Sequence, residues 1–242
     1  MTMLGMDTSN QGMVLCLADN KQLIGTYLSA NQKNHSTTLM PGIEFLMAEN
    51  NKKPKDLTSI IVAEGPGSYT GLRIGVTTAK TLAWTLGIDL LAVSSLAVIA
   101  ASYQEQDGLI VPLINARRGN VYSGAYKWQE GQLIQVIEDQ HTELVAWLES
   151  LLERKEPIIL TGIDCLSFEA EIKELDSPFI QCDLESYNQV LDGRAFLKLD
   201  KLAKKVTSIE DFVPNYLKRV EAEEKWLETH QEQAGSSYVE RV

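Results

Sequence analysis

One stretch of the chain, residues 60–86, restricts the possible folds more than any other. It begins with a run of β-branched and small apolar residues at positions 60–63, which is typical of a buried strand. Glycine and proline at positions 65–67 then end the strand, because proline has no amide donor and glycine permits backbone angles that other residues avoid. Apolar residues recur at helical spacing from Leu72 to Leu86. The stretch therefore predicts a strand, a tight turn and a helix.

The predicted helix also carries a second stripe, which is made of small residues spaced four apart: Gly71, Gly75, Ala79 and Ala83. Small residues let another backbone come close. We therefore expect the helix to pack with one stripe on its own sheet and with the other on a second helix.

The glycines of the turn match three known functional loops poorly. A dinucleotide-binding loop needs a closer spacing of its glycines, and a P-loop needs a lysine followed by serine or threonine. A nucleophile elbow centred on Ser68 would need glycine two residues before and two residues after it, where the chain has Pro66 and Thr70. The turn is therefore expected to serve backbone geometry and not catalysis.

The segment GPGSYTGLRIGVTTAKTLA resembles the hallmark segment of the bacterial TsaB (YeaZ) family, in the TsaD/Kae1-like branch of the actin/hexokinase/Hsp70 superfamily. The likeness extends to MDTS, HSTTLMPGI, SSL, INARRGNVY and PNYLKRVEA, which together span almost the whole chain up to Ala222. It implies an α/β fold with two actin-like lobes: a better-preserved N-terminal lobe over 1–105 and a shortened C-terminal lobe over 106–220, whose last helix can pack back on the first lobe. The acidic residues 221–242 are expected to form a frayed or disordered tail.

Members of this family are non-catalytic partners of TsaD, which forms N6-threonylcarbamoyladenosine at position 37 of tRNAs that read codons beginning with A. The resemblance therefore implies a cytoplasmic scaffold that binds TsaD, works with TsaE and meets tRNA only within the complex. When TsaD is absent, the same surface is expected to form a homodimer. No tightly bound cofactor is implied, although a nucleotide can bind at the joint with TsaD.

The resemblance places the docking surface for TsaD on two helices, over 36–50 and 70–86. The periodicity alone does not separate the side chains that face outward from those that face inward. The residues expected at this surface are Leu39, Ile43, Met47, Gly71, Arg73, Ile74, Gly75, Thr77 and Lys80.

Asp7, Thr8 and Ser9 follow the first predicted strand. In the superfamily this turn contacts the phosphates of ATP, and backbone amides and hydroxyls suit that role. The resemblance therefore implies a vestigial or shared phosphate site at these three residues. On the residues alone, the same pattern is more typical of an Asx or ST turn at a hairpin.

Several departures from TsaD and its superfamily argue against independent catalysis. The two histidines that bind the metal in TsaD align with Ser95 and Ile99, and isoleucine cannot bind a metal. Asn115 stands where the second phosphate loop usually has aspartate, and no Gly-Gly pair is present for an adenosine-binding turn. No catalytic residue and no metal site are therefore expected.

Two other functions stay open. A kinase-like ATPase of the same superfamily would hold Mg-ATP with Asp7 and the turn at 115–119. Arg117 and Arg118 in that turn fit phosphate contacts or a solvated turn equally well. A peptidase would need a metal or an activated nucleophile, and neither occurs at a usable spacing.

The formal net charge of −11 argues against tRNA binding by this chain alone, because proteins that grip nucleic acid usually show a basic footprint. A helix expected over 188–205 nevertheless carries a basic ridge, which fits tRNA phosphates or, more commonly, a solvated helix face. The ridge consists of Arg194, Lys198, Lys201 and Lys205.

The sequence also indicates where such a chain works. No apolar run approaches the length of a membrane span, and the first residues lack the features of a secretory signal. The three cysteines are scattered, which is typical of a reducing cytoplasm and not of a disulfide framework.

Overall fold

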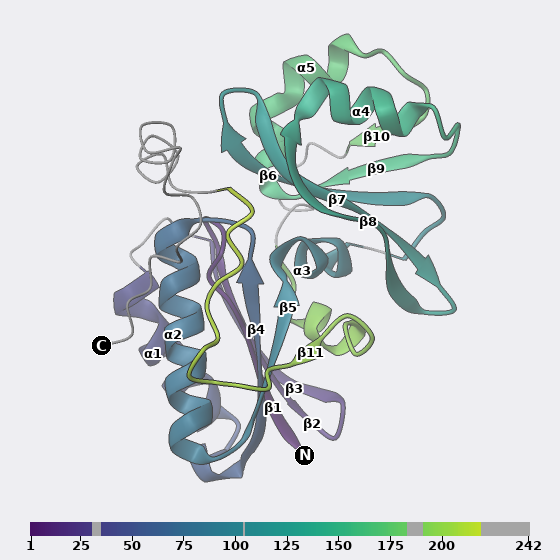
Figure 1. The fold of residues 1–242 in the computed structure, drawn as a ribbon. Coiled ribbons are helices and arrows are strands. Elements are labelled where there is room, and N and C mark those ends of the chain that lie inside the picture. The colour runs from purple at the N-terminus through teal and green to yellow at the C-terminus, as the bar shows by residue number, and fades with distance from the viewer. Residues whose placement is uncertain (31–34, 104, 183–190, 219–242) are drawn as a thin grey trace, which may run out of the picture.

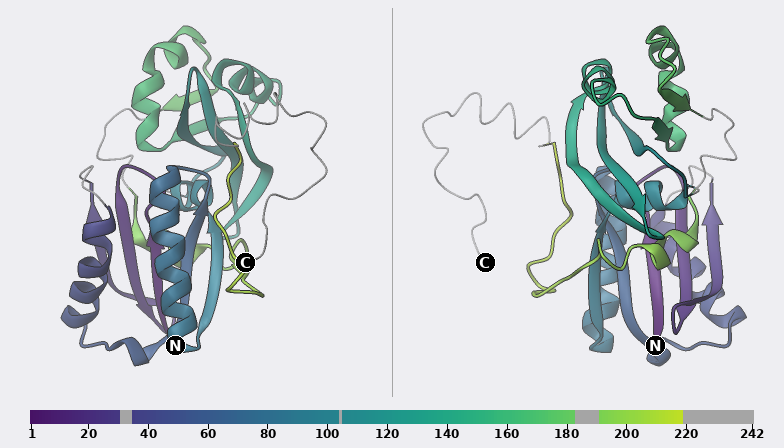
Figure 2. Two further views of the ribbon diagram at one scale, coloured as in Figure 1. Left: turned by 60° about the vertical axis from the view of Figure 1, so that its left-hand side comes forward. Right: turned by 90° about the vertical axis from the view of Figure 1, so that its right-hand side faces the viewer.

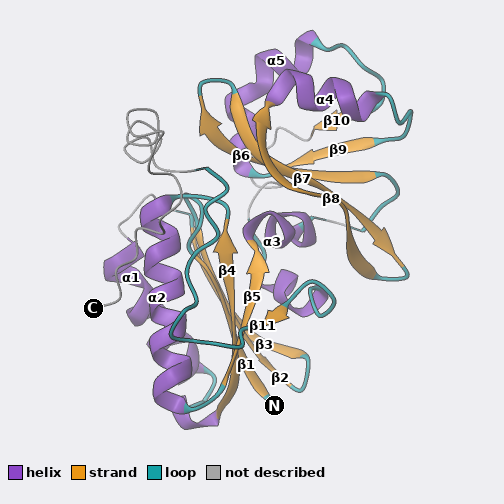
Figure 3. Ribbon diagram, in the orientation of Figure 1, coloured by secondary structure: helices purple, strands orange, loops and turns teal. Residues whose placement is uncertain are grey.

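The computed structural model describes residues 1–30, 35–103, 105–182 and 191–218. Two lobes are present, each built on a mixed β-sheet with helices packed against it (Figure 1). The strand order is β11-β5-β4-β1-β2-β3 in the first lobe and β10-β9-β6-β7-β8 in the second. Figure 3 separates the helices and strands of both lobes by colour. The fold is α/β and of the two-lobed actin-like kind, as predicted.

The elements of the first lobe come from both ends of the described chain. Its strands are β1 (Thr2–Asp7), β2 (Met13–Asp19), β3 (Gln22–Ser29), β4 (Leu57–Gly65), β5 (Asp89–Ser94) and β11 (Lys204–Lys205). Its helices are α1 (His35–Glu49), α2 (Tyr69–Leu86), α3 (Ser95–Ser102) and the short 3₁₀ helices η1 (Pro54–Asp56) and η4 (Gly193–Lys198).

The second lobe is continuous in sequence. Its strands are β6 (Leu109–Arg117), β7 (Asn120–Gln129), β8 (Gln132–Glu143), β9 (Ile158–Thr161) and β10 (Ile180–Cys182). Its helices are α4 (Leu144–Leu152), the 3₁₀ helix η2 (Ile163–Phe168) and α5 (Glu169–Glu174).

The predicted strand, turn and helix over 60–86 are confirmed as β4, a short turn and α2. The Ser68 hydroxyl caps the helix by accepting a hydrogen bond from the Gly71 amide nitrogen over 3.4 Å. Gly87 ends the helix with a left-handed φ of 64°, a conformation that glycine adopts without a steric penalty.

One face of the first sheet is covered by α1 and α2. β1 lies in the middle of this sheet, because it pairs antiparallel with β2 and parallel with β4. α1 connects β3 to β4, and α2 connects β4 to β5. The core under the two helices includes Leu4, Met6, Leu15, Ile43, Val76 and Ala79.

The other face of the first sheet shares its core with the second lobe. α3 lies between the two sheets, and its residues 95–101 are all buried (Figure 1). The shared core includes Val14, Ile61, Ala97, Ile110, Tyr126 and Ile159. The two lobes are therefore joined by one continuous apolar interior and not by a hinge peptide alone.

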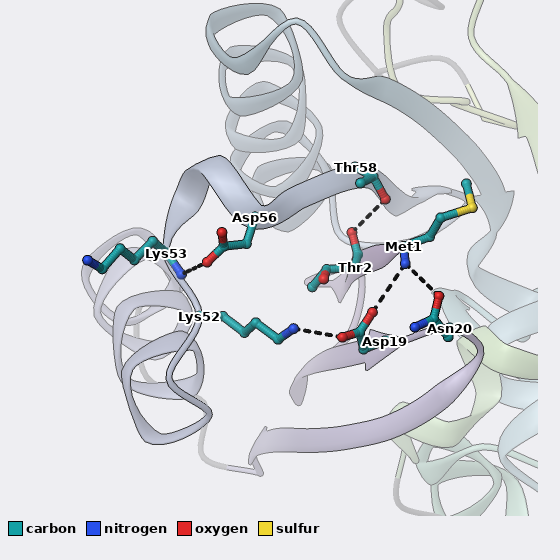
Figure 4. Close-up of polar contacts among 8 residues, drawn as sticks. All are labelled: Met1, Thr2, Asp19, Asn20, Lys52, Lys53, Asp56 and Thr58. Carbon is teal, nitrogen blue, oxygen red and sulfur yellow. Dashed lines mark hydrogen bonds and ion pairs between the residues drawn. The ribbon is translucent and has the colours of Figure 1, made fainter.

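Polar contacts hold the end of the first sheet that lies away from the second lobe (Figure 4). Lys52 Nζ donates a hydrogen bond to the Asp19 carboxylate over 2.7 Å, and Thr58 Oγ1 donates to the Thr2 carbonyl oxygen over 3.1 Å. The loop before β4 is thus tied to β1 and β2. β1, β4 and β5 are parallel, and their carboxyl ends, at the opposite end of the sheet, point toward the junction between the lobes (Figure 1).

After residue 191 the chain returns to the first lobe. η4 places Ala195, Phe196 and Leu199 in or beside the shared core, and β11 pairs antiparallel with β5. Residues 206–218, which we call the C-terminal strap, then run beside α2 (Figures 1 and 2). The last part of the expected C-terminal lobe therefore packs on the N-terminal one. The expected tail over 221–242 lies outside the described residues.

The helix expected over 188–205 is wrong for residues 191–205, and positions 188–190 lie outside the described ranges. Tertiary packing overrides the helical pattern, because η4 presses Phe196 against the backbone of β1. A Cβ at Gly5 would lie 2.7 Å from the Phe196 ring. The remaining residues reach β5 as a strand and not as a helix.

The expected basic ridge does not form either. Arg194 pairs with Asp192 over 2.5 Å, and Lys205 pairs with Asp89 over 2.7 Å. The Lys198 ammonium lies 5.1 Å from the centre of the Trp128 ring. Three of the four cations of the predicted ridge thus point to different neighbours. Among the described helices, none is both long and apolar enough to cross a bilayer.

Candidate functional site

The turn after β1 is sealed by the start of α2. Asp7, Thr8 and Ser9 have exposed fractions of 0%, 2% and 1%. Thr8 Oγ1 donates a hydrogen bond to the Gly71 carbonyl oxygen over 2.7 Å. The Ser68 amide nitrogen donates to the Ser9 carbonyl oxygen over 2.7 Å. Polar groups that were predicted to meet phosphate are instead used to join β1 to α2.

Two glycines of the small-residue stripe make this contact possible. A Cβ at Gly71 would lie 2.1 Å from the Thr8 carbonyl oxygen, and a Cβ at Gly75 would lie 2.4 Å from Thr8 Oγ1. Gly71 and Gly75 therefore face the interior of this chain, and their contact with a partner stays a prediction. The close approach that they permit is to a turn of the same chain.

The Asp7 carboxyl group acts as an internal acceptor in the sealed turn. Its Oδ1 accepts a hydrogen bond from the Ser9 amide nitrogen over 2.7 Å. Its Oδ2 is buried and has no hydrogen-bond partner in the described part of the chain. Burial raises the pKa of Asp7 above its usual value, although the bonds from Ser9 and the charge of His35 oppose that shift. The predicted phosphate residues thus face the interior in this structure.

A cavity of about 100 Å³ separates the residues after this turn from the second lobe. It is smaller than the roughly 300–1,000 Å³ of typical small-molecule sites. The described residues that line it include no aspartate, glutamate, lysine or arginine. They are Asn10, Gln11, Gly12, Leu28, Ala30, Ile99, Leu113, Gly162, Ile163 and Leu191. Among the residues that the structure describes, the junction between the lobes is therefore mostly apolar around this cavity.

The two positions that align with the metal-binding histidines of TsaD lie on α3. Ile99 lines the cavity, and Ser95 is buried at the start of the helix. Ser95 Oγ has no hydrogen-bond partner among the residues that the structure describes. Over those same ranges, no three His, Cys, Asp or Glu side chains come close enough together to share a metal ion.

The turn between β6 and β7 is fixed by its own residues and by the following loop. The Asn115 amide nitrogen donates a hydrogen bond to the Asp164 carboxylate over 2.8 Å, and Asn115 Oδ1 accepts one from the Arg117 amide nitrogen over 2.8 Å. Burial raises the pKa of Asp164 above its usual value. Arg117 and Arg118 are exposed, with positive φ angles of 69° and 54°. Asn115 therefore shapes this turn.

The inner surface of α1 accounts for three residues that were predicted to contact a partner. Leu39, Ile43 and Met47 are buried against the first sheet. These residues therefore form the apolar stripe by which an amphipathic helix faces the core of its own domain, and their contact with a partner stays a prediction.

The predicted partner residues of α2 have different surroundings. Arg73 and Thr77 are exposed, and Ile74 is half-buried beside the core. Lys80 Nζ donates hydrogen bonds to the carbonyl oxygens of Glu210 and Phe212 over 2.9 and 2.6 Å. Lys80 therefore holds the C-terminal strap against α2.

Large apolar side chains on the outer surface were missed by the sequence analysis. They are Met40 and Phe45 of α1 and Tyr69 and Trp84 of α2, and Phe45 and Trp84 are 57% and 69% exposed. A signal was present for Phe45, because it is an apolar residue out of phase with the buried stripe of α1. Tyr69 also stacks on Tyr216 of the strap, with ring centres 5.0 Å apart.

Comparisons with known proteins place the chain in a family. A family model described as TsaD, tRNA N6-adenosine threonylcarbamoyltransferase, matches residues 25–226. The Bacillus subtilis tRNA threonylcarbamoyladenosine biosynthesis protein TsaB is 42% identical over 231 residues, which cover 95% of this chain and 99% of the relative. The chain belongs to the TsaB (YeaZ) family. It is thus related to TsaD and is grouped with tRNA threonylcarbamoyladenosine biosynthesis proteins, as the sequence predicted.

More distant members of the TsaB family agree with this assignment. The Escherichia coli TsaB is 25% identical over 160 residues, which cover 65% of this chain and 68% of the relative. The solved structure of YeaZ from Pseudomonas aeruginosa superposes with a TM-score of 0.72 at 23% identity, covering 89% of this chain and 99% of that one. The latter shows that the fold is shared.

A polar cluster of this TsaB-family chain joins the lobes and was also missed by the sequence analysis. The Asp139 carboxylate of β8 accepts hydrogen bonds from Ser94 Oγ, the Tyr126 hydroxyl and, over 2.9 Å, Gln135 Nε2. Burial raises the pKa of Asp139, and these three donors oppose the shift. Ser94 also caps α3 by accepting from the Leu96 amide nitrogen over 3.0 Å. The cluster therefore ties the second sheet to the first turn of α3.

Proposed function

We propose that this chain is a non-catalytic subunit that supports TsaD in forming N6-threonylcarbamoyladenosine at position 37 of tRNAs that read codons beginning with A. The observation that carries the proposal is the sealed turn after β1. Thr8 Oγ1 bonds to Gly71, and Asp7 is fully buried, so the turn that should hold phosphate is used for packing. The described residues that line the neighbouring cavity carry no charge, which supports the same conclusion, because ATP carries several negative charges.

The docking surface for TsaD is the outer side of α1 and α2. It combines the exposed aromatic side chains of Phe45 and Trp84 with Arg73 and Thr77. Aromatic residues and arginine are the types that most often dominate binding energy at protein interfaces. The same surface forms a homodimer when TsaD is absent.

Docking acts on TsaD by population shift. Because the binding free energy is gained only in the docked arrangement, it favours the conformation of TsaD in which the active site is ordered. TsaE joins this complex, and tRNA is contacted only within it. Nucleotide binds, if at all, at the joint between the two proteins. The complex works in the cytoplasm, in line with three cysteines that carry no disulfide among the described residues.

The proposal is tested with Trp84→Glu, which places a charge on the outer side of α2. We expect at least about a tenfold loss of affinity for purified TsaD by calorimetry, because a central aromatic anchor is lost. Nucleoside mass spectrometry of tRNA from depleted cells should show modification restored by the wild-type chain and not by this variant. Leu166→Glu is the matched control, since Leu166 is an exposed apolar residue of the second lobe. Equal TsaD binding by both variants would contradict the docking surface.

Gly75→Trp is not a suitable probe of docking, because Gly75 faces Thr8 and not the outside. The new ring would displace the turn after β1 and unfold the first lobe. A loss of TsaD binding would then report the fold and not the interface.

The alternative function is a kinase-like enzyme that binds ATP by itself. The observation that favours it is the buried Asp7 Oδ2 without a described partner, since such an atom is suited to a bound ligand. Calorimetry of the isolated chain with Mg-ATP separates the two functions. Micromolar binding, with hydrolysis that Asp7→Ala abolishes, would establish the enzyme and overturn the scaffold.

A further inference from the structure

A hollow of about 330 Å³ lies between the C-terminal strap and the edge of the first sheet. Its lining comes from the end of β4, from β5, from β11 and from the first residues of the strap. Figure 1 shows β11 beside β5 and the strap that continues from it toward α2. The volume lies within the range of small-molecule sites. The described residues that line the hollow include none of the proposed docking surface, so the inference stands apart from the proposed function.

Hydrogen bonds fix the strap on both sides of the hollow. The Val206 amide nitrogen donates to the Leu90 carbonyl oxygen over 2.9 Å. Farther along the strap, the Asn215 amide nitrogen donates to the Glu64 carbonyl oxygen over 2.7 Å. Between these two points, Lys80 of α2 binds two carbonyl oxygens of the strap. The walls of the hollow are therefore formed without a ligand, which lowers the cost of binding one.

Some polar groups of the hollow already have partners within the fold. Lys205 Nζ pairs with the Asp89 carboxylate over 2.7 Å. Ser208 Oγ donates a hydrogen bond to the Asp211 carboxylate over 2.8 Å and accepts one from the Asp211 amide nitrogen over 3.3 Å. These contacts shape the turn of the strap around the hollow.

Three other side chains that line the hollow make no hydrogen bond within the described part of the chain. They are the Glu64 carboxylate, the Lys204 ammonium and the Thr207 hydroxyl. Glu64 is half-buried at the end of β4, whereas Lys204 and Thr207 are exposed. Burial raises the pKa of Glu64, and the charge of Lys204 opposes that shift. A carboxylate, an ammonium group and a hydroxyl are thus available to a ligand in one hollow.

The charges of the hollow select the class of ligand. A lone anion would meet the carboxylates of Glu64 and Asp211, and a lone cation would meet the ammonium groups of Lys204 and Lys205. In the ranges that the structure describes, no three His, Cys, Asp or Glu side chains are placed to share a metal ion. A small zwitterion fits both signs of charge, because its ammonium donates to a carboxylate and its carboxylate accepts from an ammonium.

We propose that this hollow binds a free α-amino acid with an apolar side chain. The ammonium of the amino acid donates hydrogen bonds to the Glu64 carboxylate. Its carboxylate accepts hydrogen bonds from Lys204 Nζ and Thr207 Oγ1. Val206 and Phe212, which are half-buried, supply the apolar part of the lining for the ligand side chain.

The exposure of the hollow sets the expected affinity. Charge pairs that water can reach contribute little each, and a ligand of this size has few atoms to bury. We therefore expect a dissociation constant of about 1 mM. The bound amino acid would contact both the strap and the sheet, so it would hold the strap on the first lobe.

The test titrates the isotope-labelled full-length chain with L-leucine and follows its backbone amides by nuclear magnetic resonance. We expect saturable shifts at residues 204–212. N-acetyl-leucine lacks the ammonium and leucinamide lacks the carboxylate, so each should bind at least about tenfold more weakly. The proposal is overturned if these amides show no saturable shift up to about 10 mM leucine, or if either analogue binds as tightly as leucine.

Variants assign the two charges of the ligand to their partners. Glu64→Gln should weaken leucine binding about tenfold and leave N-acetyl-leucine binding unchanged, because only the ammonium contacts Glu64. Lys204→Gln should weaken leucine binding to a similar degree and leave leucinamide binding unchanged. Lys201→Gln is the matched control, since it removes an exposed cation of the same segment that does not line the hollow, and it should bind leucine as wild type does.

The Lys204 variant keeps the proposal testable if Glu64→Gln disturbs the strap. Lys204 is exposed, so its substitution should leave the fold intact. Leucine binding by Lys204→Gln with the affinity of wild type would overturn the proposal.

Discussion

The inner and outer surfaces of α2 differ in the size of their residues and in what they contact. Gly71 and Gly75 face the turn after β1 at distances that exclude any side chain. Arg73, Thr77 and Trp84 are exposed on the other side. Small residues here mark an approach within the chain, whereas exposed large residues mark the surface left for a partner. The same helix thus seals the turn after β1 and presents the docking surface that we propose.

The largest effect is expected from filling the inner surface. Gly71→Val should lower the free energy of unfolding by about 3 kcal/mol or more, because its Cβ would lie 2.1 Å from a backbone oxygen. Urea titration measures the change. Gly87→Ala is the control: its site is open although its φ is positive, so about 1 kcal/mol is expected. Equal costs at the two positions would show that α2 does not press on the turn.

A smaller effect is expected from removing one hydrogen bond at the same contact. Thr8→Val keeps the shape of the side chain and removes the donor to the Gly71 carbonyl oxygen, which should cost about 1 kcal/mol of unfolding free energy. The matched control is Thr81→Val on α2, whose hydroxyl bonds to the Thr77 carbonyl oxygen at an exposed site. If the control cost as much as Thr8→Val, the buried bond would have no special role in the seal.

The inner surface should also give stability a dependence on pH. Because burial raises the pKa of Asp7, the folded chain binds this proton more tightly than the unfolded chain does. Stability should therefore fall as pH rises from the ordinary carboxyl pKa through the raised one. Asp7→Asn carries no titrating proton, so its stability relative to wild type should increase over that window in urea titrations at several pH values.

Asp192→Asn provides a control of opposite sign. Burial raises the pKa of Asp192, but the hydrogen bonds and charge of Arg194 outweigh it and leave the pKa lowered. The stability that the ionised Asp192 carboxylate contributes is present above the ordinary carboxyl pKa. It is lost as the pH falls through the lowered pKa. The stability of Asp192→Asn relative to wild type should therefore increase as the pH is lowered. If the free energy of unfolding changed with pH in the same way for wild type and Asp7→Asn, burial would not raise the pKa of Asp7.

The smallest effect on stability is expected at the outer surface. Thr77→Glu should change the free energy of unfolding by less than about 0.5 kcal/mol, because Thr77 is exposed. It should nevertheless weaken TsaD binding in calorimetry, since a charge is placed in the proposed interface. Ala146→Glu, at an exposed position of α4, serves as the control and should leave binding intact. A stable variant that still binds TsaD would move the docking surface elsewhere.

Local sequence patterns predicted the positions of strands and helices better than they predicted which side chains face the core. The run of β-branched residues, the glycine-proline turn and the helical spacing predicted β4 and α2 correctly. Within residues 191–205, the expected helix failed because Ala195, Phe196 and Leu199 pack into the core in or beside a 3₁₀ turn, and Lys204–Lys205 form a short strand. Helical spacing alone cannot separate these cases, since tertiary packing outweighs propensity in short segments.

The candidate site depended on contacts between distant residues. Thr8 and Gly71 are 63 positions apart, and Ser94 and Asp139 are 45 positions apart. Neither contact leaves a periodic signal, so neither the sealed turn nor the joint between the lobes was predicted. Of the residues expected at the interface, the buried Leu39, Ile43 and Met47 had been chosen by the apolar stripe that marks a core.

The sequence by itself determined the family and the two-lobed α/β fold. These depend on residue identity and on short-range spacing, which the chain carries along its length. Only the tertiary structure decided that the glycines of α2 close over Thr8 and that Phe45 and Trp84 stay outside. Such contacts arise when packing brings distant segments together, and packing is a property of the whole core.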